Sequence, residues 1–141
     1  MGNNVAVCPS CGAKNRVPIT ASGSPQCAKC QTNLPWLVEA GDAEFADAID
    51  TNRLVLVDLW APWCGPCRMV APVLERLSVE FATTLKVVKV NVDDNPRTSA
   101  RFDARSIPTL VILRGGTTVT RLVGAQPEAV LRKRIDDLLA G

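Results

Sequence analysis

The 141-residue chain carries six cysteines as three Cys-x-x-Cys pairs, an arrangement that limits what it can fold into. The pairs are Cys8 with Cys11, Cys27 with Cys30, and Cys64 with Cys67. The sequence contains no His. This absence excludes a Cys-His catalytic device and any zinc site that needs an imidazole, so the chemistry must come from Cys, Asp, Glu and Lys.

The first 33 residues differ in composition from the rest of the chain. They are rich in Cys, Gly, Ser, Pro and Asn, whereas apolar runs and amphipathic stretches alternate from Leu34 onward. We therefore expect a small module at 1–33 and one domain of ordinary size at 34–141. The module holds three basic and no acidic residues (+3), and the chain carries +2, which leaves −1 for the domain. Neither part suggests nucleic acid as a partner.

The start of the sequence lacks the basic and apolar character of a secretion signal, and no apolar run approaches about 18 residues. We therefore expect a cytoplasmic protein with no membrane partner, and we expect a monomer. In a reducing compartment, cysteines more often bind metal or perform redox chemistry than form structural disulfides.

Apolar periodicity predicts alternating strands and helices after residue 34. Strands are expected at 36–38, 54–60, 86–92, 109–113 and 118–123, and helices at 42–50, 64–81, 95–102 and 127–139. The nearly unbroken apolar run at 54–60 is typical of a strand buried on both faces, and Gly115-Gly116 predicts a tight antiparallel hairpin. The order predicts an α/β fold, a mixed sheet with helices on both faces.

Details of three helices follow from the same patterns. Asp42 is expected to cap the first helix and Asn95 the third. Ala46 is expected on the buried face of the first helix, and Val130 and Leu139 on that of the last.

The third cysteine pair follows the buried strand and opens a helix. Unpaired backbone N–H groups and a partial positive charge at a helix start stabilise a thiolate, so Cys64 is the expected nucleophile. Cys67, one turn later, is the expected resolving thiol, while Gly65 permits the sharp entry and Pro66 suits a first helical turn. A metal knuckle or a pair without function are the alternatives, but the remaining four cysteines already make a complete metal-binding set.

These motifs resemble the thioredoxin family. The matching segments are 57–68 (VDLWAPWCGPCR), 107–109 (IPT), 115–116 (GG) and 123–125 (VGA), in the family's order and spacing. The resemblance covers residues 34–141 and implies a thioredoxin-like three-layer α/β/α fold. It also implies a reductase of disulfide-containing client proteins that binds no organic cofactor and is recycled by an NADPH-dependent thioredoxin reductase.

The resemblance implies roles for further residues. Asp58 would exchange a proton with Cys67, Lys89 would tune this acid, and Pro108 would be a cis-proline facing the cysteines. Taken alone, they read as an acid at a strand end, a surface lysine and a strand-start proline. The implied client-binding surface comprises Trp60, Trp63, Gly65, Pro66, Ile107, Pro108, Gly124 and Ala125, although Trp60 and Ile107 taken singly would be core residues.

The other four cysteines form two pairs separated by fifteen residues, a spacing within the range of zinc ribbons. The expected ligands of one structural zinc ion are Cys8, Cys11, Cys27 and Cys30. Two extra redox pairs or a disordered metal-free tail are the alternatives. With this module, the whole chain resembles the zinc-containing bacterial thioredoxin-2 type. The module could be a redox-sensitive regulator or a docking surface for clients.

The leading hypothesis is an enzyme that reduces protein disulfides, because the dipeptide Gly65-Pro66 has no polar group that would overstabilise the Cys64 thiolate. A zinc-regulated chaperone or scaffold would use the apolar surface without a redox cycle. An isomerase or oxidase would differ in reduction potential.

Overall fold

The computed structural model describes residues 4–20 and 24–141. A five-stranded sheet lies at its centre in the order β3-β5-β4-β6-β7. The strands are β3 (Leu37–Glu39), β4 (Leu54–Trp60), β5 (Leu85–Asn91), β6 (Thr109–Arg114) and β7 (Thr117–Val123). β5 is parallel to β3 and β4, whereas β6 pairs antiparallel with β4 and β7. The mixed sheet expected from the sequence is confirmed.

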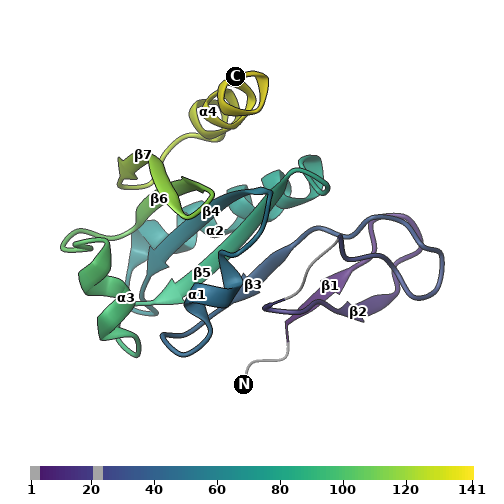
Figure 1. Ribbon diagram of the computed structural model, residues 1–141, viewed down its shortest axis with the longest axis horizontal. Coiled ribbons are helices and arrows are strands. Elements are labelled where there is room, and N and C mark those ends of the chain that lie inside the picture. Colours follow the sequence, from purple (N-terminus) through teal and green to yellow (C-terminus); the bar gives the residue numbers. More distant parts are fainter. Residues whose placement is uncertain (1–3, 21–23) are drawn as a thin grey trace.

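Helices cover both faces of this sheet (Figure 1). They are α1 (Phe45–Ala48), α2 (Gly65–Glu80), α3 (Pro96–Arg101) and α4 (Glu128–Ala140). Successive side chains of a strand point to opposite faces. Leu56 of β4 therefore packs with Leu74 of α2 in a cluster shared with α4, while Val57 packs with Phe45 of α1 and Phe102 near α3. The expected three-layer α/β/α arrangement is confirmed.

The N-terminal module forms a sheet of its own beside β3 (Figure 1). Its two short strands, β1 (Val5–Val7) and β2 (Lys14–Arg16), pair antiparallel. Ala6 and Val17 are buried in the same apolar cluster as Trp36 and the residues on the α1 side of the main sheet. The module therefore packs against the larger fold and shares its apolar core.

Two buried polar contacts join the module to the sheet. The Trp36 indole donates a hydrogen bond to the Pro18 carbonyl at 2.8 Å. Lys86 is 1% exposed, and its Nζ donates to the carbonyls of Ile19 at 2.6 Å and Ala48 at 2.7 Å, 4.1 Å from the centre of the Trp36 ring. Burial lowers the pKa of Lys86 to about 8, against the stabilising effect of these contacts on its charged form.

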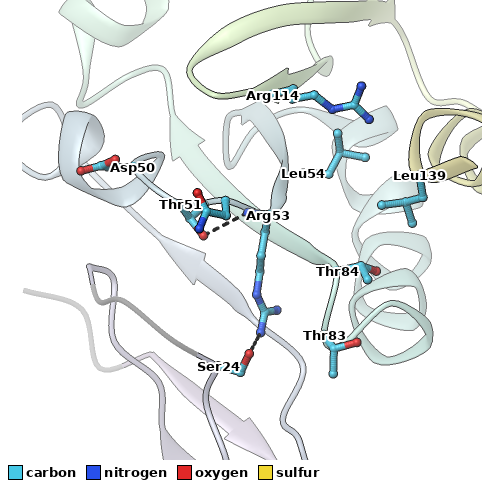
Figure 2. A pocket seen from close by; sticks show the side chains of 10 residues that line it. Ser24, Asp50, Thr51, Arg53, Leu54, Thr83, Thr84, Arg114 and Leu139 are labelled. Carbon is cyan, nitrogen blue, oxygen red and sulfur yellow. Dashed lines mark hydrogen bonds between the residues drawn. The ribbon is translucent and has the colours of Figure 1, made fainter. Parts of the chain in front are cut away.

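A third contact lies at the start of β4. Figure 2 shows Arg53 extended toward Ser24, whose hydroxyl accepts a hydrogen bond from Nη2 of Arg53 at 2.6 Å. Nη1 of Arg53 donates to the carbonyls of Ala82 at 2.6 Å and Leu85 at 3.2 Å. A cavity of about 680 Å³ opens beside these groups, at the end of β4 opposite the one that leads to Cys64.

The capping expectations were wrong in an informative way. Asp42 does not cap α1; its carboxylate accepts hydrogen bonds from the backbone N–H groups of Arg97 at 3.1 Å and Thr98 at 2.8 Å, at the start of α3. Asn95 occupies the N-cap position of α3 without capping it, and its side-chain oxygen accepts from the N–H of Asp42 at 2.8 Å. Asp42 and Asn95 are 53 positions apart, and each side chain accepts a hydrogen bond from the backbone of the segment that contains or follows the other residue.

Three predicted buried positions also differ. Ala46 is exposed and Ala48 is buried instead, while Val130 and Leu139 of α4 are each 39% exposed. The α4 contact with the sheet is narrower than expected and is made by the buried Leu131 and Ile135, with the partly buried Leu138 packed against the same cluster. Among the residues that the structure describes, none of the helices has the length and apolar character needed to cross a membrane.

Candidate functional site

The Cys64–Cys67 pair lies between the end of β4 and the start of α2. Cys64 is the N-cap residue of α2, and its Sγ accepts a hydrogen bond from the backbone N–H of Cys67 at 3.2 Å. The two cysteines form a disulfide with their Cα atoms 5.3 Å apart. When this bond is reduced, the same N–H group and the positive end of the helix stabilise a thiolate at Cys64.

The neighbours of the pair in the sequence are exposed. Gly65 and Pro66 form the start of α2 at the surface, and the side chain of Trp63 is 66% exposed. The Trp63 indole donates to a carboxylate oxygen of Asp93 at 3.0 Å, which fixes the orientation of the ring. The fold therefore presents an apolar rim beside a Cys64 side chain that is only 3% exposed.

A second segment of the chain lies beside Cys64. The Ile107–Pro108 peptide bond is cis, as the resemblance implies, and the Ile107 carbonyl oxygen lies 3.7 Å from Sγ of Cys64. The backbone N–H of Gly124 donates to the Pro108 carbonyl at 2.8 Å, and Gly124 has a φ of 92°, which favours glycine. Ala125 follows at the surface. Residues separated by more than 40 positions thus surround one sulfur atom.

Asp58 lies in β4 on the face that packs against α2. It is 1% exposed, and neither of its carboxylate oxygens has a hydrogen-bond partner within residues 4–20 and 24–141. Burial raises the pKa of Asp58 to about 6, while the positive charge of Lys89 acts in the opposite direction. Lys89 is paired with Asp58 in the register of β5 and β4. A buried carboxyl that titrates near neutral pH can exchange protons under physiological conditions.

The four cysteines of the module gather at one point. Their sulfur atoms all lie within 4.8 Å of one another, with Cys8 and Cys30 at 3.5 Å and Cys11 and Cys27 at 3.6 Å. A tetrahedral zinc ion with Zn–S distances of about 2.3 Å requires sulfur atoms roughly 3.8 Å apart. This set of thiols could therefore bind a metal ion.

The two knuckles share one backbone geometry. Sγ of Cys8 accepts from the N–H of Ser10 at 3.4 Å, and Sγ of Cys27 accepts from the N–H of Lys29 at 3.4 Å. Gly12 and Gln31 follow the two pairs at equivalent positions, with φ of 77° and 66°. Glycine adopts this left-handed conformation readily at the first position, whereas the second knuckle reaches the same conformation with a residue that carries a side chain.

The pKa values of the module's thiols bear on whether a cation is needed to keep all four ionised together. The backbone N–H of Cys30 lowers the pKa of Cys27 to about 6. The N–H of Ala13 lowers the pKa of Cys11, but desolvation and the neighbouring sulfur atoms outweigh it and raise that pKa to about 11. Thiolates this close repel one another, so all four can be ionised together at neutral pH with a bound metal ion.

Comparison with known proteins decides the family. The family model described as Thioredoxin matches residues 36–137. The chain belongs to the thioredoxin family. Family membership, together with the Cys64–Cys67 pair, makes it a protein-disulfide reductase.

Curated thioredoxins match the same part of the chain. The thioredoxin of Synechocystis sp. is 48% identical over 102 residues, which cover 72% of this chain and 95% of that protein. The thioredoxin of Mycobacterium tuberculosis is 48% identical over 103 residues, 72% of this chain and 89% of that protein. The thioredoxin of Alicyclobacillus acidocaldarius is 49% identical over 98 residues, 70% of this chain and 93% of that protein.

The module precedes the residues that match the thioredoxin model. Four cysteines close together ahead of a thioredoxin fold support the resemblance to the zinc-containing thioredoxin-2 type. Sequence reasoning missed Asn15, which lies between the two knuckles. Its side-chain oxygen accepts from the N–H of Ala28 at 2.9 Å, and its Nδ2 lies 3.5 Å from Sγ of Cys27. A single Asn in a polar segment carries no pattern that could have revealed this role.

Two further residues near the cysteine sites were not expected. The Thr32 hydroxyl lies 3.2 Å from Sγ of Cys30. Met69, early in α2, is 70% exposed. An exposed methionine is adaptable, and such residues are common on surfaces that bind varied partners.

Proposed function

We propose that Cys64 is the nucleophile in the reduction of client disulfides. In the reduced protein, the Cys64 thiolate attacks one sulfur of a client disulfide; a bond forms between Cys64 and the client, and the client's second sulfur leaves as a thiolate. The position of Cys64 at the start of α2, with the Cys67 N–H 3.2 Å from its sulfur, is the observation that carries this assignment.

Cys67 completes the exchange. Its thiol loses a proton and attacks Sγ of Cys64, so that the Cys64–Cys67 disulfide forms and the client sulfur leaves as a thiolate that takes up a proton. Two electrons pass from the two cysteines to the client. Asp58 accepts the proton of Cys67, and Lys89 limits the rise of the Asp58 pKa.

Clients bind across the surface beside Cys64. An extended client segment pairs with the backbone at Ile107, just before β6, while Gly124 permits close approach. The apolar side chains that would contact the client are Trp60, Trp63, Pro66, Pro108 and Ala125, together with the backbone of Gly65. An NADPH-dependent thioredoxin reductase would return two electrons to the Cys64–Cys67 disulfide. The protein would act as a monomer in the cytoplasm, where the four thiols of the module stay reduced.

The module at 1–33 would hold one zinc ion, and the thioredoxin domain would span residues 34–141. Cys8, Cys11, Cys27 and Cys30 supply four soft ligands at distances that fit a tetrahedron. When bound, the ion would supply folding energy to a segment with few buried apolar side chains. Because all four positions would be filled by protein ligands, the site would be structural rather than catalytic.

The test is insulin reduction by two serine variants. Cys64→Ser should abolish turnover, whereas Cys67→Ser should still attack and accumulate a mixed disulfide that mass spectrometry detects. Cys30→Ser is the matched control, because it changes a cysteine of the module and leaves the pair in place. Full activity of Cys64→Ser, or a mixed disulfide formed through Cys67, would overturn the assignment.

A further inference from the structure

Glu39 ends β3 in line with two charged residues already assigned to the active site. In the sheet register, Glu39 pairs with Lys89 of β5, and Lys89 pairs with Asp58 of β4. Paired residues on neighbouring strands project to the same face, and two strand spacings place Glu39 and Asp58 about 10 Å apart at the backbone. One lysine therefore lies between two carboxyl groups on the α2 face of the sheet.

The side-chain contacts tie Glu39 to the active site. Oε2 of Glu39 accepts a hydrogen bond from the indole N–H of Trp60 at 3.3 Å. Nζ of Lys89 lies 5.2 Å from the centre of the same Trp60 ring. Trp60 packs against the cluster that contains both active-site cysteines. Glu39, Lys89 and Trp60 thus form one group, which adjoins the disulfide through the indole.

The backbone of Glu39 is held by the N-terminal module. The side-chain oxygen of Asn4 accepts from the N–H of Glu39 at 2.8 Å, and Nδ2 of Asn4 donates to the Glu39 carbonyl at 3.4 Å. Asn4 therefore pairs with the edge of β3 as a neighbouring strand would. The module therefore contacts Glu39, the first of the three charged residues (Glu39, Lys89 and Asp58) that lie side by side across β3, β5 and β4.

Other charged groups face Glu39 from the surrounding elements. Glu44 and Asp94 line the same cavity of about 530 Å³ as Glu39 and Trp60. Glu44 accepts the N–H of Gly41 at 3.0 Å, and Asp94 accepts from the side-chain amide of Asn91 at 3.4 Å. The hydrogen-bond partners of these two acids lie outside the row of Glu39, Lys89 and Asp58, whereas Glu39 and Asp58 both have Lys89 as their neighbour on β5.

We propose that Glu39 is a positioning residue of disulfide exchange, which competes with Asp58 for the charge of Lys89 and so sets the pH at which Asp58 takes the proton of Cys67. This inference rests on the proton-transfer role given to Asp58 in the proposed function. Burial raises the pKa of Glu39 to about 7, so both carboxyl groups change charge near neutral pH. Two interacting acids titrate as a pair in two overlapping steps.

The test follows the carboxyl carbon of Asp58 by ¹³C NMR in the oxidised protein between pH 4 and 9. In the parent protein the titration should be broad, because the charge of Glu39 changes during it. Glu39→Gln keeps an acceptor for Trp60 but removes the charge. The Asp58 titration should then narrow to one step with its midpoint about half a pH unit lower, which would raise the ratio of ionised to protonated Asp58 at pH 6 roughly threefold.

Two further variants separate charge from hydrogen bonding. Glu39→Asp keeps the charge and shortens the side chain, so the broad titration should return. Glu44→Gln removes a neighbouring charge that is not paired with Lys89, so the Asp58 titration should match the parent's. An unchanged midpoint in Glu39→Gln, or equal shifts in the Gln and Asp variants, would overturn the proposal.

Rate measurements connect the titration to exchange. The rate at which Cys67 resolves a mixed disulfide should rise at lower pH in Glu39→Gln than in the parent. If Glu39→Gln does not fold, Asp58→Asn tests the same coupling in reverse, since Glu39 should then titrate in one step at lower pH; an unchanged Glu39 titration would overturn the proposal. The NMR experiment uses no client, so its outcome is independent of whether Cys64→Ser retains insulin reduction, which tests the proposed function itself.

Discussion

At Cys64 and at Cys8, the buried sulfur of a Cys-x-x-Cys pair accepts the backbone N–H of the pair's second cysteine, at 3.2 and 3.5 Å. What lies opposite the sulfur differs. Cys64 faces the carbonyl of Ile107 at 3.7 Å, whereas Cys8 faces Sγ of Cys30 at 3.5 Å. The spacing of two cysteines thus gives the local hydrogen bond, and the tertiary neighbour distinguishes a sulfur placed for disulfide exchange from one in a set of thiols that could bind a metal ion.

The two regions also differ in how they are held. The Cys64 pair sits on a helix of 16 residues that packs along the sheet, and its geometry follows from the core. Cys8 and Cys11 sit on a turn between two strands of three residues each, and Cys27 and Cys30 sit on a turn closed by a single bridge between Gln26 and Asn33. Burial of Ala6 and Val17 against the sheet supplies part of the module's stability. A bound metal ion would supply the rest.

The largest expected effect separates the two sites by metal content. Cys27→Ser removes one of four ligands and should reduce bound zinc from one per chain to less than about a tenth of that, because the ion needs four protein ligands. Elemental analysis of the purified protein measures this directly. Cys64→Ser is the matched control and should keep one zinc per chain. Equal zinc contents in the two variants would place the metal elsewhere.

Mild oxidation should affect the two sites in sequence. When the reduced protein meets one equivalent of insulin disulfide, two of its six thiols should be lost and zinc should stay bound, because metal-bound thiolates are weaker nucleophiles than the Cys64 thiolate. Thiol counting together with a zinc-sensitive dye follows both events. Zinc release in step with the first two thiols would show that the module responds to redox state and is not purely structural.

Lys86 links the two regions, and its titration should appear in the pH dependence of the unfolding free energy. The pKa of Lys86 is about 8 in the folded protein and about 10.4 in an unfolded chain, so the unfolded state binds more protons between these values. Relative to Lys86→Met, the parent should gain about 3 kcal/mol of unfolding free energy as the pH rises from 8 to 10.5. Urea denaturation at several pH values measures the difference.

The exposed Lys133 supplies the control for this experiment. Lys133→Met should show no such trend, because the side chain is 77% exposed and forms a surface ion pair with Asp137. A flat difference for Lys86→Met would mean that the contacts of Lys86 with the Ile19 and Ala48 carbonyls keep it charged throughout this pH range.

Much of this arrangement could be predicted from the sequence because the relevant patterns are local. The buried run at β4, the helix that starts at Cys64 and the Gly115-Gly116 hairpin all depend on neighbouring residues, and all occur where expected, with small shifts at their ends. The four clustered cysteines were recognisable from their number and spacing.

Features that depend on distant parts of the chain could not be predicted in this way. Asp42 caps α3 rather than α1 because the tertiary fold brings residue 98 beside it, and capping rules see only near neighbours. Lys86 looks like an ordinary strand residue until the module supplies the Ile19 carbonyl as its partner. Glu39 belongs to no motif, and the strand order alone places it beside Lys89.

The smallest expected effects concern Asp58, whose replacement should separate stability from activity. Its pKa of about 6 exceeds that of an unfolded Asp, near 3.9, so the folded protein loses stability as the pH rises between these values and bears the full loss above them. Asp58→Asn should therefore gain about 2 kcal/mol over the parent between pH 4 and 7. The exposed Asp137→Asn should show no such gain.

Activity should change in the opposite direction. Without a carboxylate to take the proton of Cys67, Asp58→Asn should resolve mixed disulfides about tenfold more slowly at pH 7. The rise of the resolution rate near pH 6 should also disappear, because no group with that pKa remains at this position. Stopped-flow measurements from pH 5 to 8 test both points. If the variant is more stable and still resolves mixed disulfides as fast as the parent, Asp58 destabilises the fold and takes no part in exchange. Substitution of the module's cysteines should leave this pH profile unchanged.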